Sequence, residues 1–304
     1  MGLRRIDTVI LPEHRAQGGF DHASVHRPGD RLYIAHTVND SVEVIDLEHR
    51  RHEATLHGFP GVAGAAVFEQ RAILVATCKR SQAVALASLR SPEAITRIAV
   101  GPRPNGLALD SHGSLALAAC LGEGTPPELA FIHLERRELV ATGPLPGRPR
   151  WTVHDPAAGC FYVNIDSPAQ ILMVSAAPPF GVLRSLPIPV PGPHGLDHDR
   201  RRGILHCACD GGEVVSVEAA SGRIVARVPI AGPPDVVFFN PRRERLYVAI
   251  ADPGVLQSID TAAGRLLETI PTGRGAKTFG FDEEREHVYA LVPEIHAAVV
   301  FAET

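Results

Sequence analysis

All four tyrosines of this chain stand at one position of a repeated phrase. The copies read Arg31-Leu32-Tyr33-Ile34-Ala35, Cys160-Phe161-Tyr162-Val163-Asn164, Arg245-Leu246-Tyr247-Val248-Ala249 and His287-Val288-Tyr289-Ala290-Leu291. Self-similarity at a period of about 20–50 residues is typical of repeat architectures. The repeat therefore limits the possible folds more strongly than composition does.

Three further copies carry another residue in place of the tyrosine: Ile73-Leu74-Val75-Ala76, Leu115-Ala116-Leu117-Ala118 and Leu205-His206-Cys207-Ala208. Each of the seven phrases follows an opening segment, and these segments begin at Asp21, Pro60, Pro104, Pro149, Pro193, Pro234 and Ala276, 39 to 45 residues apart. A four-stranded propeller blade has roughly 40–50 residues. The sequence thus predicts an all-β fold, a seven-bladed β-propeller.

The sixth unit shows the expected strands of one blade most clearly. They cover residues 236–239, 245–250, 255–259 and 265–270, and Pro, Gly, Asn and Asp separate them. The seventh unit ends after its third strand at residues 297–301, so we expect residues 4–11 to supply the missing outer strand. Because the repeat fills the chain, residues 1–304 are predicted to form a single domain.

Composition excludes several classes of partner. The net charge is −4 and no basic stripe is present, which argues against nucleic-acid binding. No apolar run approaches the ~20 residues of a membrane helix, and the N-terminus does not resemble a secretory signal. We therefore expect no membrane contact and a cytoplasmic location. Five cysteines, an odd number, fit a reducing compartment; Cys207 and Cys209 share a strand face as a thiol site would, although packing is the favoured interpretation.

The repeated phrase, its period and the closing N-terminal strand resemble the bacterial YVTN-type seven-bladed propellers. The resemblance covers the whole chain and implies the fold. It does not imply one activity, because propellers include enzymes, ligand-binding proteins and scaffolds.

Function is expected at positions where the units differ. In propellers the loops before each first strand gather on one face around the axial channel. The first residues of the seven first strands are His22, Ala63 (or Val62), Asn105, Arg150, His194, Asp235 and Lys277. A wet channel mouth would explain their polarity alone, whereas their mixture of imidazole, amide, carboxylate and cationic groups favours a ligand site.

Some of these residues have more specific expectations. His194 lies between a rigid proline and a permissive glycine, as at a close approach to a ligand. Arg150 and Lys277 could bind a carboxylate or phosphate. Trp151 is expected to pack between blades or to stack on a ligand. His36, Asp166, Asp210 and Asp252 follow on the same face, more as turn residues than as ligand contacts, and His206 replaces the repeat's tyrosine as a core residue.

One functional hypothesis is an enzyme. The Pro-His-Gly sequence and the polar positions resemble streptogramin-type lyases, which are metal-assisted. That resemblance implies that His194 is a general base and that Arg150 and Lys277 stabilise an enolate. A gluconolactonase-type site is a related possibility, matched by Asn105 and Asp235; that family has six blades, and its acidic first ligand has no counterpart at His22. A divalent metal is possible on either reading.

The other hypothesis is a module without catalysis. It would bind a small polar or anionic molecule, a peptide or a protein partner through His22, Asn105, Asp235, Trp151 and His36. No nucleophile elbow, phosphate loop or zinc signature is present. We favour binding, and leave the ligand, the cofactor and the oligomeric state open.

Overall fold

The computed structural model describes residues 2–110 and 114–304. The chain separates into two compact units: unit 1 holds Met1–Pro12, Asn164–Ile171 and Leu186–Thr304, and unit 2 holds Glu13–Val163 and Leu172–Ser185. The regular structure in the described residues is almost entirely β-sheet, with short 3-10 turns at Arg27–Gly29, Thr37–Asn39, Glu69–Arg71 and Pro293–Ile295.

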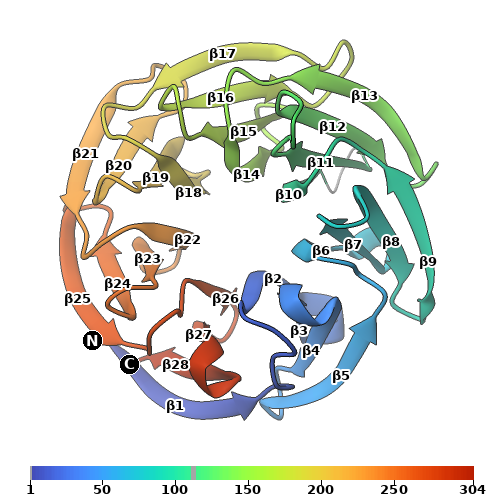
Figure 1. Cartoon of the computed structure of the whole chain (residues 1–304). Helices are drawn as coiled ribbons and strands as arrows, with labels where there is room; N and C mark the ends of the chain where they lie inside the picture. The colour runs from blue at the N-terminus through green and yellow to red at the C-terminus, as the bar shows by residue number, and fades with distance from the viewer. Residues whose placement is uncertain (1, 111–113) are drawn as a thin grey trace. The chain divides into compact units, whose positions relative to one another are not determined.

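Unit 2 contains three complete four-stranded antiparallel sheets (Figure 1). Their strands are β2 (Phe20–His26), β3 (Arg31–His36), β4 (Ser41–Asp46) and β5 (Arg51–His57); β6 (Val62–Phe68), β7 (Ile73–Cys78), β8 (Ala83–Ser88) and β9 (Ser91–Ala99); and β10 (Pro104–Asp110), β11 (Leu115–Cys120), β12 (Glu128–His133) and β13 (Glu138–Pro144). In each sheet the strands are hydrogen-bonded in chain order.

A fourth sheet has the same order and contains residues of both units. Its strands are β14 (Pro149–Asp155), β15 (Cys160–Ile165), β16 (Gln170–Ser175) and β17 (Val182–Pro187). The boundary between the units passes through β15, β16 and β17.

Unit 1 contains the remaining three sheets. Two are consecutive: β18 (Pro193–Asp199), β19 (Ile204–Cys209), β20 (Glu213–Glu218) and β21 (Ile224–Pro229); then β22 (Pro234–Asn240), β23 (Arg245–Ile250), β24 (Val255–Asp260) and β25 (Arg265–Pro271). The last combines β26 (Thr278–Asp282), β27 (His287–Val292) and β28 (Ala297–Glu303) with β1 (Leu3–Ile10).

The N-terminal strand completes the last sheet, as predicted. β1 pairs antiparallel with β28 (Figure 1). In this pair Val9 lies opposite Ala298. Seven four-stranded sheets with this closure confirm the predicted fold class, an all-β seven-bladed propeller. A single domain over residues 1–304 stays a prediction.

The repeated phrase forms the second strand of each sheet, where both faces are covered. Tyr162, Tyr247 and Tyr289 are almost fully buried, and His206 occupies the same position with 2% exposure. Burying one large apolar side chain contributes about 1.5–3 kcal/mol, so this strand is the centre of each sheet's core. All five cysteines are buried and unbridged, and burial raises the pKa of Cys207, which agrees with a packing role.

The fourth strands are more exposed than the second and third. In β17, for example, every residue except Leu186 is exposed. No helix in residues 2–110 and 114–304 is long and apolar enough to span a lipid bilayer.

Candidate functional site

Four of the predicted site residues lie on β-bulges at the start of first strands. The register shifts between Pro193 and Gly195 in β18 and between Pro234 and Val237 in β22, so His194 and Asp235 stand within these two bulges. The same shift contains Asn105 in β10 and His22 in β2. At a bulge the side chain of the extra residue does not follow the regular alternation of side chains between the two faces of the sheet. These side chains are therefore not part of the regular ladder of their own sheet.

The residue after two of these bulges is glycine because the next sheet's backbone approaches closely. A Cβ added to Gly195 would lie 2.5 Å from the carbonyl oxygen of Asp235, and one added to Gly106 would lie 2.6 Å from that of Arg150. Neither position can hold a side chain without moving backbone. Gly195 thus fixes the spacing between the bulges that carry His194 and Asp235.

A buried side chain holds the backbone at His194. The Nδ2 of Asn164 donates to the carbonyl oxygens of His194, at 3.0 Å, and of Gly195, at 3.1 Å. Thr77 occupies the same repeat position in unit 2 and donates to the carbonyl oxygen of Asn105 at 2.8 Å. Asn164 and Thr77 each hold the bulge of the following sheet.

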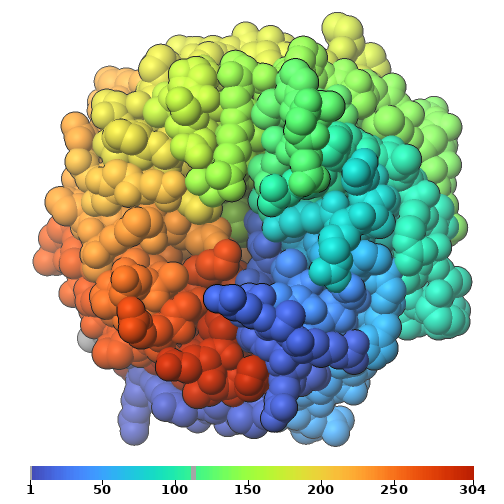
Figure 2. Space-filling model, viewed as in Figure 1, coloured from blue at the N-terminus to red at the C-terminus, as the bar shows by residue number. Residues whose placement is uncertain are grey.

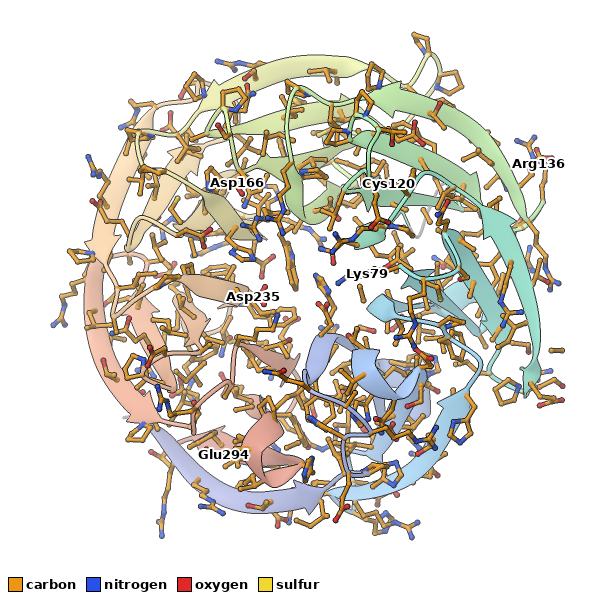
Figure 3. The ribbon with its side chains drawn as sticks, in the orientation of Figure 1. Lys79, Cys120, Arg136, Asp166, Asp235 and Glu294 are labelled. Carbon is orange, nitrogen blue, oxygen red and sulfur yellow. The ribbon has the colours of Figure 1, made fainter. Side chains whose placement is uncertain are left out.

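Four side chains of unit 1, which we call the His194 cluster, form a continuous chain: Asp210, His194, Asp235 and Lys277. His194 Nδ1 lies 2.8 Å from Asp210 Oδ1, and its Nε2 lies 3.2 Å from Asp235 Oδ1. The other oxygen of Asp235 lies 3.0 Å from Lys277 Nζ. Figure 3 shows Asp235 on β22, away from the outer strand β25.

Strand pairing explains why Asp210 reaches His194. Pro193 lies opposite Cys209 in the β18–β19 pair, so Asp210, the residue after β19, comes next to the beginning of β18. Gly192 makes room for it: its φ is +67°, and a Cβ there would lie 2.7 Å from the Cβ of Asp210. A left-handed φ and a close contact both require glycine at this position.

The His194 cluster alternates carboxylates with nitrogen groups. His194 and Asp235 are mostly buried, with side-chain exposures of 18% and 15%, while Asp210 and Lys277 are 33% and 47% exposed. Hydrogen bonds to charged partners are stronger than neutral ones when they are partly shielded from water. The cluster therefore presents a carboxylate at one end and an ammonium group at the other, joined by an imidazole and a second carboxylate.

A second group in unit 2, which we call the His22 cluster, consists of Lys79, Asp21, His22 and Trp151. Lys79 Nζ lies 3.1 Å from Asp21 Oδ2, and Asp21 Oδ1 lies 2.7 Å from His22 Nδ1. The His22 ring stacks on Trp151 with ring centroids 4.2 Å apart and planes at 30°. Figure 3 shows Lys79 beside the end of β7. Trp151 of the fourth sheet thus contacts the first sheet.

The structure brings some of the predicted site residues together within each unit. His194, Asp235 and Lys277 come together in unit 1, and His22 meets Trp151 in unit 2. Arg150 and Asn105 belong to unit 2, where their carbonyl oxygens face Gly106 and Gly64.

His36 is a separate case, because it is completely buried. Its Nδ1 lies 2.9 Å from Glu43 Oε1, and Glu43 also accepts from Ser41 and Thr55. Burial raises the pKa of Glu43, but the hydrogen bonds from His36, His52, Thr55 and Ser41 outweigh it and hold that pKa well below its usual range. His36 therefore stabilises the first sheet.

The segment before β2 covers this buried network. Asn39 Nδ2 donates to the carbonyl oxygen of Glu13 at 2.9 Å, and the Arg15 amide donates to Asn39 Oδ1 at 2.9 Å. His14, between them, packs edge-on against His36 with ring centroids 4.9 Å apart. Figure 2 shows this dark blue segment lying across the viewer's face of the sheet.

Sequence reasoning missed Asp21 and Lys79, and it treated Asp210 as a turn residue. A signal was present, because Lys79 and Asp210 each directly follow the second strand of their sheet. No group of three or more His, Cys, Asp or Glu side chains among the described residues is arranged to hold a metal ion.

Comparison with known proteins identifies the fold. No protein-family model matches this chain, and no curated protein matches it. Among solved structures, Kuenenia stuttgartiensis hydrazine synthase is similar, with a TM-score of 0.84, 17% sequence identity, and coverage of 96% of this chain and 97% of that chain. A likeness at this identity shows the propeller fold alone.

Proposed function

We propose that this protein binds a small polar or anionic molecule through the His194 cluster. We also propose that it is a YVTN-type propeller, supported by the tyrosine phrase and the closing strand β1, and that it is cytoplasmic, as its cysteine content suggests. The similarity to hydrazine synthase contributes only the fold to these proposals.

The observation that supports binding most strongly is the arrangement of side chains on bulges. His194 and Asp235 stand at register shifts of β18 and β22, and their side chains contact each other across the two sheets at 3.2 Å. Lys277, 47% exposed, would bind an anionic group of the ligand, and Asp210, 33% exposed, would accept from a ligand N–H or O–H. A few placed polar groups of this kind are typical of ligand sites.

The test is a thermal-shift screen of lactones, carboxylic acids and phosphates, followed by calorimetric titration of the hits. A ligand that binds the folded state raises the melting temperature. We expect Lys277→Gln and His194→Ala to weaken binding tenfold or more, because a charge-assisted hydrogen bond contributes about 1.5–3 kcal/mol.

Arg274→Gln is the matched control. It removes a cation from an ion pair with Asp252 in which both side chains are more than three-quarters exposed, so binding should not change. Equal losses in Lys277→Gln and Arg274→Gln would indicate general charge attraction and would contradict the proposed site.

A catalytic role is the second candidate, supported by the contact between His194 and Asp210. A carboxylate at Nδ1 orients an imidazole and is a common arrangement for general acid–base catalysis. We propose opening of a cyclic ester, by a lyase or a lactonase, as the corresponding reaction. Acid release from a lactone panel, measured with and without added Mg²⁺, would test it, and turnover that survives His194→Ala would exclude this role. A protein-interaction scaffold, the third possibility, stays a prediction.

A further inference from the structure

A cavity lies in unit 2, between β13 and the segment that joins β16 to β17. It has a volume of about 600 Å³. Val140 and Ala141 form one wall, Pro178, Pro179 and Phe180 form the other, and His133 and Arg136 also line it. This volume falls within the roughly 300–1,000 Å³ range of small-molecule sites.

The wall formed by residues 175–181 is held by its own hydrogen bonds. The Ser175 amide donates to the carbonyl oxygen of Gly181 at 2.9 Å, and the Phe180 amide donates to that of Ala177 at 2.9 Å. Ser175 Oγ also donates to the Ala177 carbonyl oxygen at 2.7 Å. The segment is thus a preformed wall, which lowers the conformational cost of binding.

Phe180 is held in an unfavourable backbone conformation that places its ring in this wall. Its φ is +48°, in the left-handed region that bulky residues rarely adopt. The ring stacks on Phe131 with centroids 4.8 Å apart and planes at 28°. On its other side Phe180 borders a smaller cavity of about 290 Å³, lined also by Val174 and Val182. Residues with such backbone strain are concentrated at functional sites of proteins, and Phe180 lines this cavity.

The polar groups of the cavity can bind an anion. The Arg136 amide donates to His133 Nδ1 at 3.3 Å, so a neutral His133 ring carries its proton on Nε2 and can donate from there. The Arg136 guanidinium is 59% exposed and pairs with Glu138 through Nε, at 2.7 Å. Its five N–H donors exceed what one carboxylate uses. Figure 3 shows Arg136 at the outer edge of unit 2.

We propose that this cavity binds a small apolar carboxylate, with its alkyl or aryl body against Phe180, Pro178 and Val140 and its carboxylate on Arg136 and His133. The walls supply apolar surface and the two nitrogen side chains supply the complementary charge and donor. The proposal is independent of the His194 cluster, because every residue that lines the cavity belongs to unit 2.

Calorimetric titration with 4-phenylbutyrate tests this proposal, and 4-phenylbutyramide is the uncharged match. We expect wild-type protein to bind the carboxylate at least tenfold more tightly than the amide. Arg136→Gln should remove that difference by weakening only the carboxylate. Ala177→Trp, a change on the exposed loop that fills the cavity, should abolish binding of both compounds while the melting temperature stays nearly constant.

Arg137→Gln is the control. Arg137 neighbours Arg136, but it lines a different cavity and donates to Thr96 Oγ1 at 3.1 Å. Its substitution should leave both affinities unchanged. The proposal would be overturned by carboxylate binding that survives Ala177→Trp, by equal losses in Arg136→Gln and Arg137→Gln, or by no binding of 4-phenylbutyrate at millimolar concentration.

Discussion

The His194 cluster of unit 1 and the His22 cluster of unit 2 share three members and differ in the fourth. In each, a lysine contacts an aspartate, which contacts a histidine on a first-strand bulge. The fourth member is the Asp210 carboxylate in unit 1 and the Trp151 indole in unit 2. One histidine is therefore held between two carboxylates, and the other is covered by an aromatic ring.

The two clusters show that the same β-bulge can place a histidine in two different environments. The bulge releases the histidine from its own sheet in both units, and the neighbouring side chain then decides its chemistry. In unit 1 the two carboxylates of Asp210 and Asp235 contact both ring nitrogens of His194. An indole face buries apolar surface on His22 and contributes about 0.5–1.5 kcal/mol beyond that burial. Ligand binding is accordingly expected in unit 1, and stabilisation in unit 2.

The largest expected effect comes from removing a strand that only unit 1 contains. Deleting residues 3–10 removes the partner of β28 and the buried Val9, and it exposes a sheet edge that invites aggregation. We expect loss of the cooperative transition, with hydrogen exchange in β26–β28 losing protection first. Val9→Lys should reproduce the loss in part, whereas Ile10→Lys, at a side chain 68% exposed, should change stability by less than about 0.5 kcal/mol. A deletion variant that melts like the full chain would contradict this role of β1.

The next largest effect is on ligand affinity, and it differs between substitutions of Asp235 and Asp21. Asp235→Asn leaves His194 and Lys277 without the carboxylate that joins them, so the affinity for a ligand found in the screen should fall tenfold or more. Asp21→Asn makes the same change in unit 2, where Trp151 covers the histidine, and should alter affinity less than twofold. Calorimetry on both variants measures the difference. Equal losses would show that the two clusters do not differ in function.

Two buried groups in one sheet of unit 1 change its stability in opposite directions as pH falls. Burial lowers the pKa of His206 in unit 1 to about 3, so the folded state excludes a proton that the unfolded chain binds near pH 6.5. This effect removes stability as pH falls from about 6.5 towards 3, but burial raises the pKa of Asp197 in the same sheet to about 6, which adds stability as pH falls below about 6 and offsets much of the loss. The low pKa of Glu43 in unit 2 removes stability only below its usual value of 4.5.

Hydrogen exchange at pH 7 and pH 5 measures how the stability of this sheet changes with pH. Amides of β18–β21 should change their protection only slightly at pH 5, because the effects of His206 and Asp197 oppose each other. His206→Phe, which cannot titrate, leaves the effect of Asp197, so β18–β21 of this variant should be better protected at pH 5 than at pH 7. An unchanged slope in that variant would contradict the opposing effects of these two groups.

The sequence predicted the strands better than the contacts of the site. The expected strand 245–250 matches β23, and the expected closure by residues 4–11 matches β1 within one residue, because the hydrophobic period and the turn residues determine both. His194 and Asp235 were predicted as site residues because they differ from the residues at the same position of the other units. The Trp151–His22 contact was not predicted, since it joins sheets that are not consecutive, and a period carries no information about such pairs.

His36 shows a second reason why site contacts were harder to predict than strands. Its position at the end of β3 suggested a surface contact, but Ser41 is its strand partner and Glu43 lies two residues further along the same face of β4. A buried carboxylate requires hydrogen-bond donors, and His36 and His52 supply them. Whether a polar side chain serves a ligand or a buried partner depends on such neighbours in the packed structure.

The smallest expected effect concerns the aromatic stack. His22→Leu keeps an apolar side chain but removes the ring that Trp151 covers, so the free energy of unfolding should fall by about 0.5–1.5 kcal/mol. Trp151 is the only tryptophan of the chain, and its emission therefore reports on this cluster alone. We expect His22→Leu to shift that emission, and His57→Leu, at an exposed position of β5, to leave it unchanged. If the emission and the stability of His22→Leu both match those of the wild type, the ring contact does not stabilise unit 2, and the assignment of separate roles to the two clusters fails.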